Sequence, residues 1–393
     1  AYYELGWGGF WFWDPVENVS LMPWLALITL LHCVIVMEKR LILTSWAVIL
    51  SIATFSLSMC GTFLVRSGIL NSVHTFANDP ERGIFVLIFL TVLILISLTI
   101  YFKYNDIEKL TRSFLLSKES AIVINNWFMM YFLGVVLVGT IYPIFLEVIT
   151  KEKISVGPPY FNQLIIPFLI PFLFIMAIGP KLDWIKNKKF DAKFTKIILL
   201  ILSILISYLI AKNFNTQVLY STLLISAALY LFFISITDLK NEKLKLSQKI
   251  SHTAFSILII SIILNSLFSE EVSVNLKKGE EKQLSNYLLK FENISKMEID
   301  NFTSLKAEIH VIHNDNKLKF YPELRLYKVP ETITSEAAIK TSLFSDNLVV
   351  VNYLKDTNYL NIRYQKKPFM LLIWLSAIML AVGGLIGLKK NFK

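Results

Sequence analysis

Long apolar runs dominate the chain, and short polar segments separate them. The runs are roughly 16–26 residues long, which is enough for a tilted helix to cross a bilayer. Nine such runs cover residues 22–38, 45–65, 83–102, 124–149, 163–181, 196–211, 218–236, 250–268 and 368–388. The pattern therefore predicts a polytopic α-helical membrane protein with about nine transmembrane helices.

One long polar block, residues 269–367, interrupts this pattern before the last apolar run. Apolar and polar residues alternate within it at 307–313, 317–321 and 347–354, and turn residues separate these runs. Alternation with a period of two is typical of half-buried strands. The block is therefore predicted to be a small β-rich domain outside the membrane.

Basic residues predict how the chain is oriented. They cluster after alternate apolar runs, at 38–40, 103–118, 181–193, 240–249 and 389–393. Such clusters favour the cytoplasmic side of a membrane. The predicted parts are an extracytoplasmic Trp-rich segment (1–21), a bundle of about eight helices (22–268), the extracytoplasmic β-rich domain (269–367), and a last helix with a basic cytoplasmic tail (368–393).

Composition agrees with a membrane protein and narrows its chemistry. The chain is 55% hydrophobic and 17% charged, with a mean hydropathy of +0.57. Its net charge of +10 comes from the loop lysines, so it is a topology signal and predicts no nucleic-acid partner. Cys33 and Cys60 lie inside apolar runs without a CxxC pair, which argues against thiol chemistry. The first residues, which lack an initiator Met, are typical of the middle of a longer chain.

The most distinctive segment is the aromatic cluster at residues 7–18. Five of its twelve residues are aromatic, and Trp7, Trp11 and Trp13 are the largest of them. Packed aromatic rings suit a large planar ligand held at the outer surface. The alternative interpretation is a simple interfacial anchor for the first helix, because Trp favours the membrane boundary. Residue types alone leave the two interpretations about equally supported.

Two histidines lie within or beside the apolar runs. His32 lies inside the first run, and His252 lies at the start of the eighth, which enters from the predicted cytoplasmic side. The two imidazoles are therefore expected at similar depth in the inner half of the bilayer, where a bis-His pair would bind haem iron. A histidine that merely bonds to a neighbouring helix is the alternative.

The remaining histidines lie outside the apolar runs. His74, in the loop between Arg66 and Arg82, shares the outer face with the aromatic cluster. It would serve as an axial ligand for haem held there, and the two arginines would pair with propionates, although solvated residues and interfacial anchors are the plainer interpretations. His310 and His313 are three apart on a predicted strand and therefore point to opposite faces, so no role is assigned to them.

Several segments together resemble one family. They are residues 7–18, 61–68, 72–74, 154–162, 320–327 and 367–369. The combination resembles the CcmF-type haem lyases of system I cytochrome c maturation, within the wider group of WWD-domain haem-handling proteins. Phe10 stands where the family commonly has another Trp.

The resemblance implies specific haem contacts. His32 and His252 match the two histidines that ligate a buried haem b, and His74 matches the second of two periplasmic histidines that ligate a haem in transit. The first of those two is expected upstream of Ala1. Trp7, Trp11, Trp13 and Asp14 fall within the WWD signature and are expected to contact the transit haem.

The resemblance also implies an activity and partners. The expected reaction joins haem to the CxxCH motif of apocytochrome c through thioether bonds, within a multi-subunit complex. Expected partners are apocytochrome c, a CcmE-type haem chaperone, a CcmH-type apocytochrome-presenting subunit and quinol. The expected location is the bacterial inner membrane, with the Trp-rich segment and the β-rich domain periplasmic. Asp14 and Glu17 are expected to cap the first helix and not to act as general bases.

Two other functions remain open on these residues. A CcmC-like haem transporter would bind and hand on haem without forming thioethers, because the WWD signature alone does not imply bond formation. A purely structural subunit would need no haem contact at all. The β-rich domain and the His32–His252 pair favour the lyase, since a simple relay needs neither.

Overall fold

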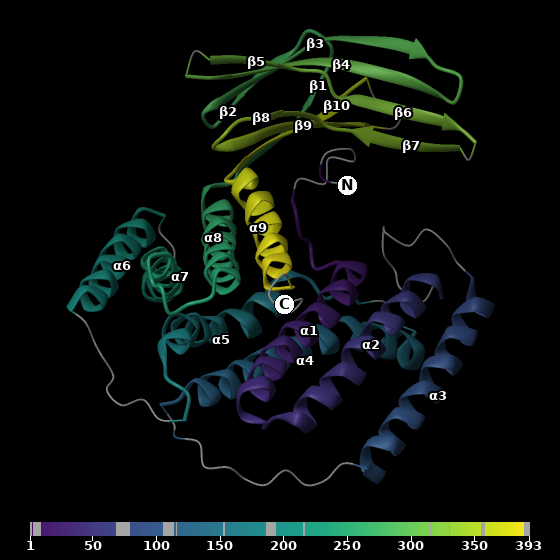
Figure 1. Cartoon of the computed structure of the whole chain (residues 1–393). Coiled ribbons are helices and arrows are strands. Elements are labelled where there is room, and N and C mark those ends of the chain that lie inside the picture. Colours follow the sequence, from purple (N-terminus) through teal and green to yellow (C-terminus); the bar gives the residue numbers. More distant parts are fainter. Residues whose placement is uncertain are drawn as a thin grey trace. The chain divides into compact units, whose positions relative to one another are not determined.

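The predicted membrane helices are present. The computed structural model describes residues 2, 9–67, 79–104, 114, 116–151, 154–185, 194–214, 217–314, 316–329, 331–354 and 358–388. Among these residues, nine helices are long and apolar enough to cross a membrane (Figure 1). They are α1 (Pro15–Arg40), α2 (Thr44–Arg66), α3 (Pro80–Tyr104), α4 (Lys118–Thr150), α5 (Pro158–Ile178), α6 (Phe194–Asn213), α7 (Val218–Asp238), α8 (Leu246–Phe268) and α9 (Met370–Leu388).

The described residues divide into two compact units. One is Trp11–Thr237, which contains α1 to α7, and we call it the helical unit. The other combines Ala1–Phe10 with Asp238–Lys393, which contains α8, α9 and all the strands. Helix α8 packs against α9 and belongs to the unit that carries the β-domain.

Helix α1 packs between α2 and α4 in the helical unit. A Cβ on Gly61 of α2 would lie 3.5 Å from the carbonyl oxygen of Val19, so the small residue allows α1 and α2 to approach closely. On the side that faces α4, Cys33 is fully buried and accepts a hydrogen bond from Asn126 Nδ2 at 3.1 Å. Small and polar residues therefore lie in the interior of this unit.

The polar block folds into two antiparallel sheets. One sheet has the strand order β1-β10-β9-β8, and the other has the order β2-β3-β4-β6-β7, with β5 paired to β4. The strands are β1 (Glu270–Leu276), β2 (Glu281–Leu284), β3 (Tyr287–Glu298), β4 (Phe302–His313), β5 (Asn316–Phe320), β6 (Glu323–Lys328), β7 (Glu331–Glu336), β8 (Ala338–Thr341), β9 (Ser345–Tyr353) and β10 (Leu360–Pro368). The three predicted alternating runs fall in β4, β5 and β9, so this prediction is confirmed.

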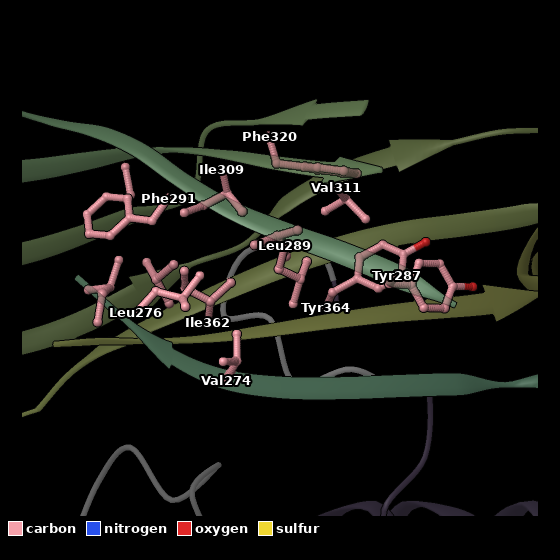
Figure 2. Packing of buried hydrophobic residues seen from close by; sticks show 14 of the residues in the cluster. Val274, Leu276, Tyr287, Leu289, Phe291, Ile309, Val311, Phe320, Ile362 and Tyr364 are labelled. Carbon is pink, nitrogen blue, oxygen red and sulfur yellow. The ribbon is translucent and has the colours of Figure 1, made fainter. Parts of the chain in front are cut away.

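The core of the β-domain lies between the two sheets (Figure 2). Leu289 and Ile309 from the larger sheet are fully buried against Val351 and Ile362 from the smaller one. At one end of this core, burial raises the pKa of Tyr364 to about 12, so its hydroxyl stays neutral at ordinary pH. The domain is a closed hydrophobic sandwich that buries its apolar side chains away from water.

Helices α8 and α9 join the β-domain to the membrane. Asn265 near the end of α8 donates to the carbonyl of Pro368 at 2.6 Å, immediately before α9 begins. Met370 of α9 packs under Leu348 on the outer face of the smaller sheet. At the other end of the pair, a Cβ on Gly383 would lie 3.0 Å from the backbone nitrogen of Ser251. Only glycine allows α8 and α9 to lie this close together there.

Candidate functional site

The aromatic cluster forms a bent arrangement of rings at the start of α1. The Trp11 and Trp13 rings lie 5.9 Å apart at 89°, so they meet edge to face. Trp13 stacks on Phe161 of α5 with ring centroids 4.2 Å apart and an angle of 8°. The two tryptophans together therefore do not form one flat surface. One face of Trp13 is covered by Phe161, and Trp11 stands across its edge.

A capping box fixes the backbone of this cluster. The Asp14 carboxylate accepts from Val16 N at 2.9 Å, and Glu17 Oε2 accepts from the N–H groups of Asp14 at 3.2 Å and Phe12 at 2.8 Å. These bonds satisfy donors that a helix start leaves unpaired. The prediction that Asp14 and Glu17 cap the first helix is confirmed. The helix begins at Pro15, seven positions before the predicted start at residue 22, because the cap and the proline both favour an earlier start.

Contacts fix both the backbone and the ring of Trp13. Its φ of 59° lies in the left-handed region, which is unfavourable for a bulky residue. Asn18, which is buried, donates through Nδ2 to the Trp13 carbonyl at 3.1 Å. The Oδ1 atom of Asn18 has no hydrogen-bond partner among the described residues. The site therefore holds a fixed indole and an unsatisfied buried acceptor close together.

Phe161 owes its position to a glycine on α4. A Cβ on Gly139 would lie 2.8 Å from the Phe161 ring and 2.7 Å from the Tyr160 ring, so no larger residue fits without moving them. Phe161 is itself fully buried. Gly139, Phe161 and Trp13 therefore form one packed series that connects α4 and α5 to the start of α1.

A cleft of about 500 Å³ opens between α1 and α2 at the same end of α1 as the aromatic cluster. It is lined by Val19, Ser20, Pro23, Ser58, Gly61, Thr62, Val65 and Arg66. Its size is within the usual range for small-molecule sites. Pro23 has no N–H to donate to the Val19 carbonyl, so that acceptor in the cleft wall lacks its helical partner. Arg66, at the end of α2, adds a positive charge to the lining.

Two residues predicted for the outer site, Trp7 and His74, lie outside the described residues. Arg66 is exposed, which leaves its guanidinium accessible to an anion. Arg82 instead pairs with Asp79, with Nε 3.1 Å from Oδ2 in an exposed ion pair. Of the two arginines considered for propionates, Arg66 is therefore the one placed beside a cleft.

His32 has the tautomer that an iron ligand needs. Its Nδ1 lies 2.8 Å from the carbonyl oxygen of Ile28, and a carbonyl only accepts, so the proton is assigned to Nδ1. This leaves the Nε2 lone pair for a metal, in the arrangement that metal-bound histidines commonly show. His32 is half-buried eight residues before Arg40, about 12 Å along α1 from its end. The residue therefore fits a haem ligand in chemistry and in depth.

His252 lies at a similar depth within its own helix. It is half-buried six residues after Leu246, about 9 Å from the start of α8. It follows Ser251, which packs against Gly383 of α9. His32 and His252 belong to different units, so their pairing around one haem stays a prediction.

The β-domain histidines make separate contacts, as predicted for opposite faces of one strand. His310 is buried, with Nε2 2.9 Å from Glu308 and Nδ1 3.0 Å from Glu292. His313 stacks on Tyr287 at 4.6 Å. Within the described part of the chain, no group of three or more His, Cys, Asp or Glu side chains is placed to hold a metal ion.

Family comparisons match the two parts of the chain that carry these features. The family described as "Cytochrome C assembly protein" matches residues 1–70, which include α1, its aromatic cap and the cleft. The family described as "CcmF C-terminal beta-sandwich" matches residues 267–368, which cover the β-domain. Both matches point to proteins of the CcmF type. These matches confirm the family resemblance, and the nine apolar helices among the described residues, with the β-domain before the last of them, confirm the predicted fold class.

Individual relatives extend this match along the chain. "Cytochrome c-type biogenesis protein CcmF" of Pseudomonas fluorescens is 36% identical over 98% of this chain and 61% of its own length. The protein of that name from Pseudomonas aeruginosa is 35% identical over 100% of this chain and 62% of its own length. A solved structure titled "Cytochrome c Heme Lyase CcmF" has a TM-score of 0.75 at 20% identity, covering 98% of this chain and 61% of that one, which supports the fold. The chain thus spans about three fifths of its CcmF relatives.

Three residues of the site were not predicted from the sequence. Asn18, Gly139 and Phe161 position Trp13, but only their fold brings them together. The sequence did contain a partial signal, because Phe161 lies in the segment at 154–162 that contributed to the family resemblance. Nothing in that segment indicated that its aromatic ring would stack on an indole far away in the sequence.

Proposed function

We propose that this chain is the haem-handling part of a cytochrome c haem lyase. The proposal rests mainly on the Trp11–Trp13–Phe161 cluster, which is held in place at the start of α1. The same end of α1 borders an open cleft whose lining includes Arg66. The likeness to CcmF proteins supports it. In this proposal the outer site binds haem as a substrate while apocytochrome c approaches.

The outer site would orient haem through shape and charge. The edge of Trp13 and the ring of Trp11 offer apolar contact to a porphyrin, because aromatic rings prefer offset or edge-to-face packing. Arg66 would pair with a propionate, since guanidinium matches a carboxylate with two hydrogen bonds. Trp7, His74 and Asp14 remain proposed members of the site, with Asp14 acting through the backbone that it caps.

The proposed reaction adds each cysteine S–H of a CxxCH motif across one haem vinyl group. A C–S bond forms at one vinyl carbon, the thiol hydrogen goes to the other carbon, and no group leaves. Asp14 and Glu17 are occupied in the capping box, so neither is free to act as a general base. The proposed role of the described residues is therefore orientation, which lowers the entropic part of the barrier.

A haem b held by His32 and His252 is the second part of the proposal. The His32 tautomer fits iron ligation through Nε2. When bound, this haem would relay an electron, with quinol as the proposed donor, to keep the substrate iron ferrous. The described residues contribute the ligand geometry and the apolar surroundings that set its potential.

The proposed setting is the bacterial inner membrane, with the aromatic cluster and the β-domain on the periplasmic side. The basic loops support this orientation through the preference of Lys and Arg for the cytoplasm. The proposed partners are apocytochrome c, a CcmE-type haem chaperone and a CcmH-type presenting subunit.

The test compares two tryptophans that each belong to an edge-to-face pair. Trp11 pairs with Trp13 at the outer end, whereas Trp127 pairs with Trp46 at 5.7 Å and 81° at the opposite end of α1 and α2. Trp11→Ala should lower the yield of covalent cytochrome c about tenfold, because loss of one aromatic contact of about 1.4 kcal/mol corresponds to that factor. Trp127→Ala should leave the yield unchanged. Haem staining of denatured cytochrome c, with equal amounts of each variant in the membrane, measures both.

The same assay separates a lyase from a haem relay. A lyase leaves haem attached to the cytochrome after denaturation, whereas a relay delivers haem that denaturation releases. Equal yields for Trp11→Ala and Trp127→Ala would contradict the proposal, and so would haem that never becomes covalent in the complete assembly.

A further inference from the structure

The β-domain presents two large apolar residues at a turn that its own core does not use. Leu343 and Phe344, between β8 and β9, are 66% and 70% exposed. Moving such a side chain from water to an apolar environment is favourable. Adjacent exposed apolar residues on an otherwise closed domain mark a contact surface.

The turn holds these two residues in a fixed conformation. Ser342 Oγ donates to the Ser345 carbonyl at 2.7 Å and accepts from the Ser345 N–H at 3.1 Å. The Ser342 N–H also donates to the Ser345 carbonyl at 3.0 Å. Little conformational entropy is therefore lost when Leu343 and Phe344 bind to a surface.

The turn lies where α9 starts. The Phe369 N–H donates to the Phe344 carbonyl at 2.8 Å, and Ser345 is paired with Pro368 in the sheet. Met370, the next residue, begins an apolar helix long enough to cross the membrane. The end of α8 lies at the same level, because the Phe268 ring is 6.4 Å from that of Phe369. Aromatic residues at such positions occupy the membrane–water interface.

We propose that Leu343 and Phe344 insert into the interfacial layer of the lipid bilayer, on the side of the membrane where the β-domain lies. The occupant is lipid because the Phe344 carbonyl accepts from Phe369, the residue immediately before the apolar helix α9, so the turn lies where that helix starts. The insertion gives the β-domain a second attachment to the membrane beside α8 and α9. It thereby fixes the height and tilt of the smaller sheet, independently of any activity of the chain.

Val329 supplies a matched comparison. It lies in the turn between β6 and β7 and is 82% exposed, so it is as apolar and as accessible as Phe344. It belongs to the larger sheet, which covers the face of the smaller sheet opposite to α9. Sheets stack about 10 Å apart, so Val329 is expected in water.

The experiment places a nitroxide spin label at each turn. Phe344→Cys, Leu343→Cys and Val329→Cys are made in the full chain, with Cys33 and Cys60 replaced by Ala, and reconstituted in phosphatidylcholine bilayers. Collisions with oxygen, which partitions into lipid, are compared with collisions with a water-soluble nickel complex. The proposal predicts that labels at 343 and 344 favour oxygen and that the label at 329 favours nickel.

Two results would overturn the proposal. Labels at 343 and 344 that favour nickel, like the label at 329, would place the turn in water. Labels that neither reagent reaches would show that protein and not lipid covers the turn. Because all three positions are exposed, the substitutions are expected to leave folding intact, and the β-sheet circular dichroism signal verifies this.

Discussion

The helical unit and the β-domain expose different kinds of residue. The β-domain buries Leu289, Ile309 and Ile362 completely, while most of its charged residues face water. The helical unit buries small and polar residues such as Cys33 and Asn126, and exposes large apolar ones such as Leu31. The difference follows from the surroundings, because lipid removes the hydrophobic drive between helices, whereas water supplies it to the sandwich. Close approach and polar contacts must therefore hold the helices together.

The largest expected effect comes from an ion pair in the helical unit whose carboxylate is buried. Arg40 Nε at the end of α1 lies 2.8 Å from Oε1 of Glu119, which is 1% exposed and also accepts from the Ile185 N–H at 3.0 Å. Glu119→Ala should lower the free energy of unfolding by about 4 kcal/mol, because it leaves the Arg40 charge without its partner.

An exposed pair close in sequence serves as the control. Glu38 lies 3.6 Å from Lys39, and both side chains are about half exposed or more. Glu38→Ala should change the free energy of unfolding by less than about 1 kcal/mol. Denaturant unfolding of the detergent-purified chain measures both variants. If Glu119→Ala were no worse than Glu38→Ala, polar contacts would not be what holds the helices.

The next effect tests the hydrophobic core of the β-domain. Ile362→Ala removes a fully buried side chain between the sheets and should cost about 3 kcal/mol through lost transfer energy and a cavity. Ile333→Ala changes a residue that is 68% exposed and should shift stability by less than about 0.5 kcal/mol. Thermal unfolding followed by the β-sheet signal checks both, and similar losses in the two variants would argue against a closed core.

A smaller effect is expected where the helices position the aromatic cluster. Gly139→Ala forces the Phe161 ring to move and should cost about 2 kcal/mol by overpacking. The displaced Phe161 no longer stacks properly on Trp13, so the yield of cytochrome c should also fall.

A compensating change makes this prediction specific. Phe161→Leu in the Gly139→Ala background should relieve the overpacking against residue 161, although not the contact with Tyr160, and so restore part of the stability without the aromatic stack on Trp13. Recovery of stability without recovery of cytochrome c yield would identify Phe161 as a positioning residue. Recovery of both would reduce its role to filling space.

The sequence was enough to predict the helices and strands that are marked by a local pattern of apolar residues. Long apolar runs predicted the membrane helices, and alternation of apolar and polar residues predicted β4, β5 and β9. The strands β2 and β7 are mostly polar and at sheet edges, so they carried no such signal. The start of α1 at Pro15 was missed even though its cap was recognised, because hydropathy marks where a helix becomes apolar and not where it begins.

Only some residues of the candidate site could be predicted from the sequence. Trp11, Trp13 and His32 could be named because indoles in a cluster and a histidine in an apolar run are unusual. The perpendicular tryptophan rings and the Gly139–Phe161–Trp13 series depend on contacts between helices that are distant in sequence. The tautomer of His32 depends on one helical carbonyl that a sequence does not show.

The absorption spectrum of the detergent-purified chain tests the central claim most directly, with His32→Ala, His252→Ala and His313→Ala measured in parallel. His313 serves as the control because it stacks on Tyr287 within the β-domain. The account predicts a reduced b-type haem spectrum that both membrane-helix variants abolish and His313→Ala retains. A chain without haem, or a spectrum that survives both His32→Ala and His252→Ala, would contradict it.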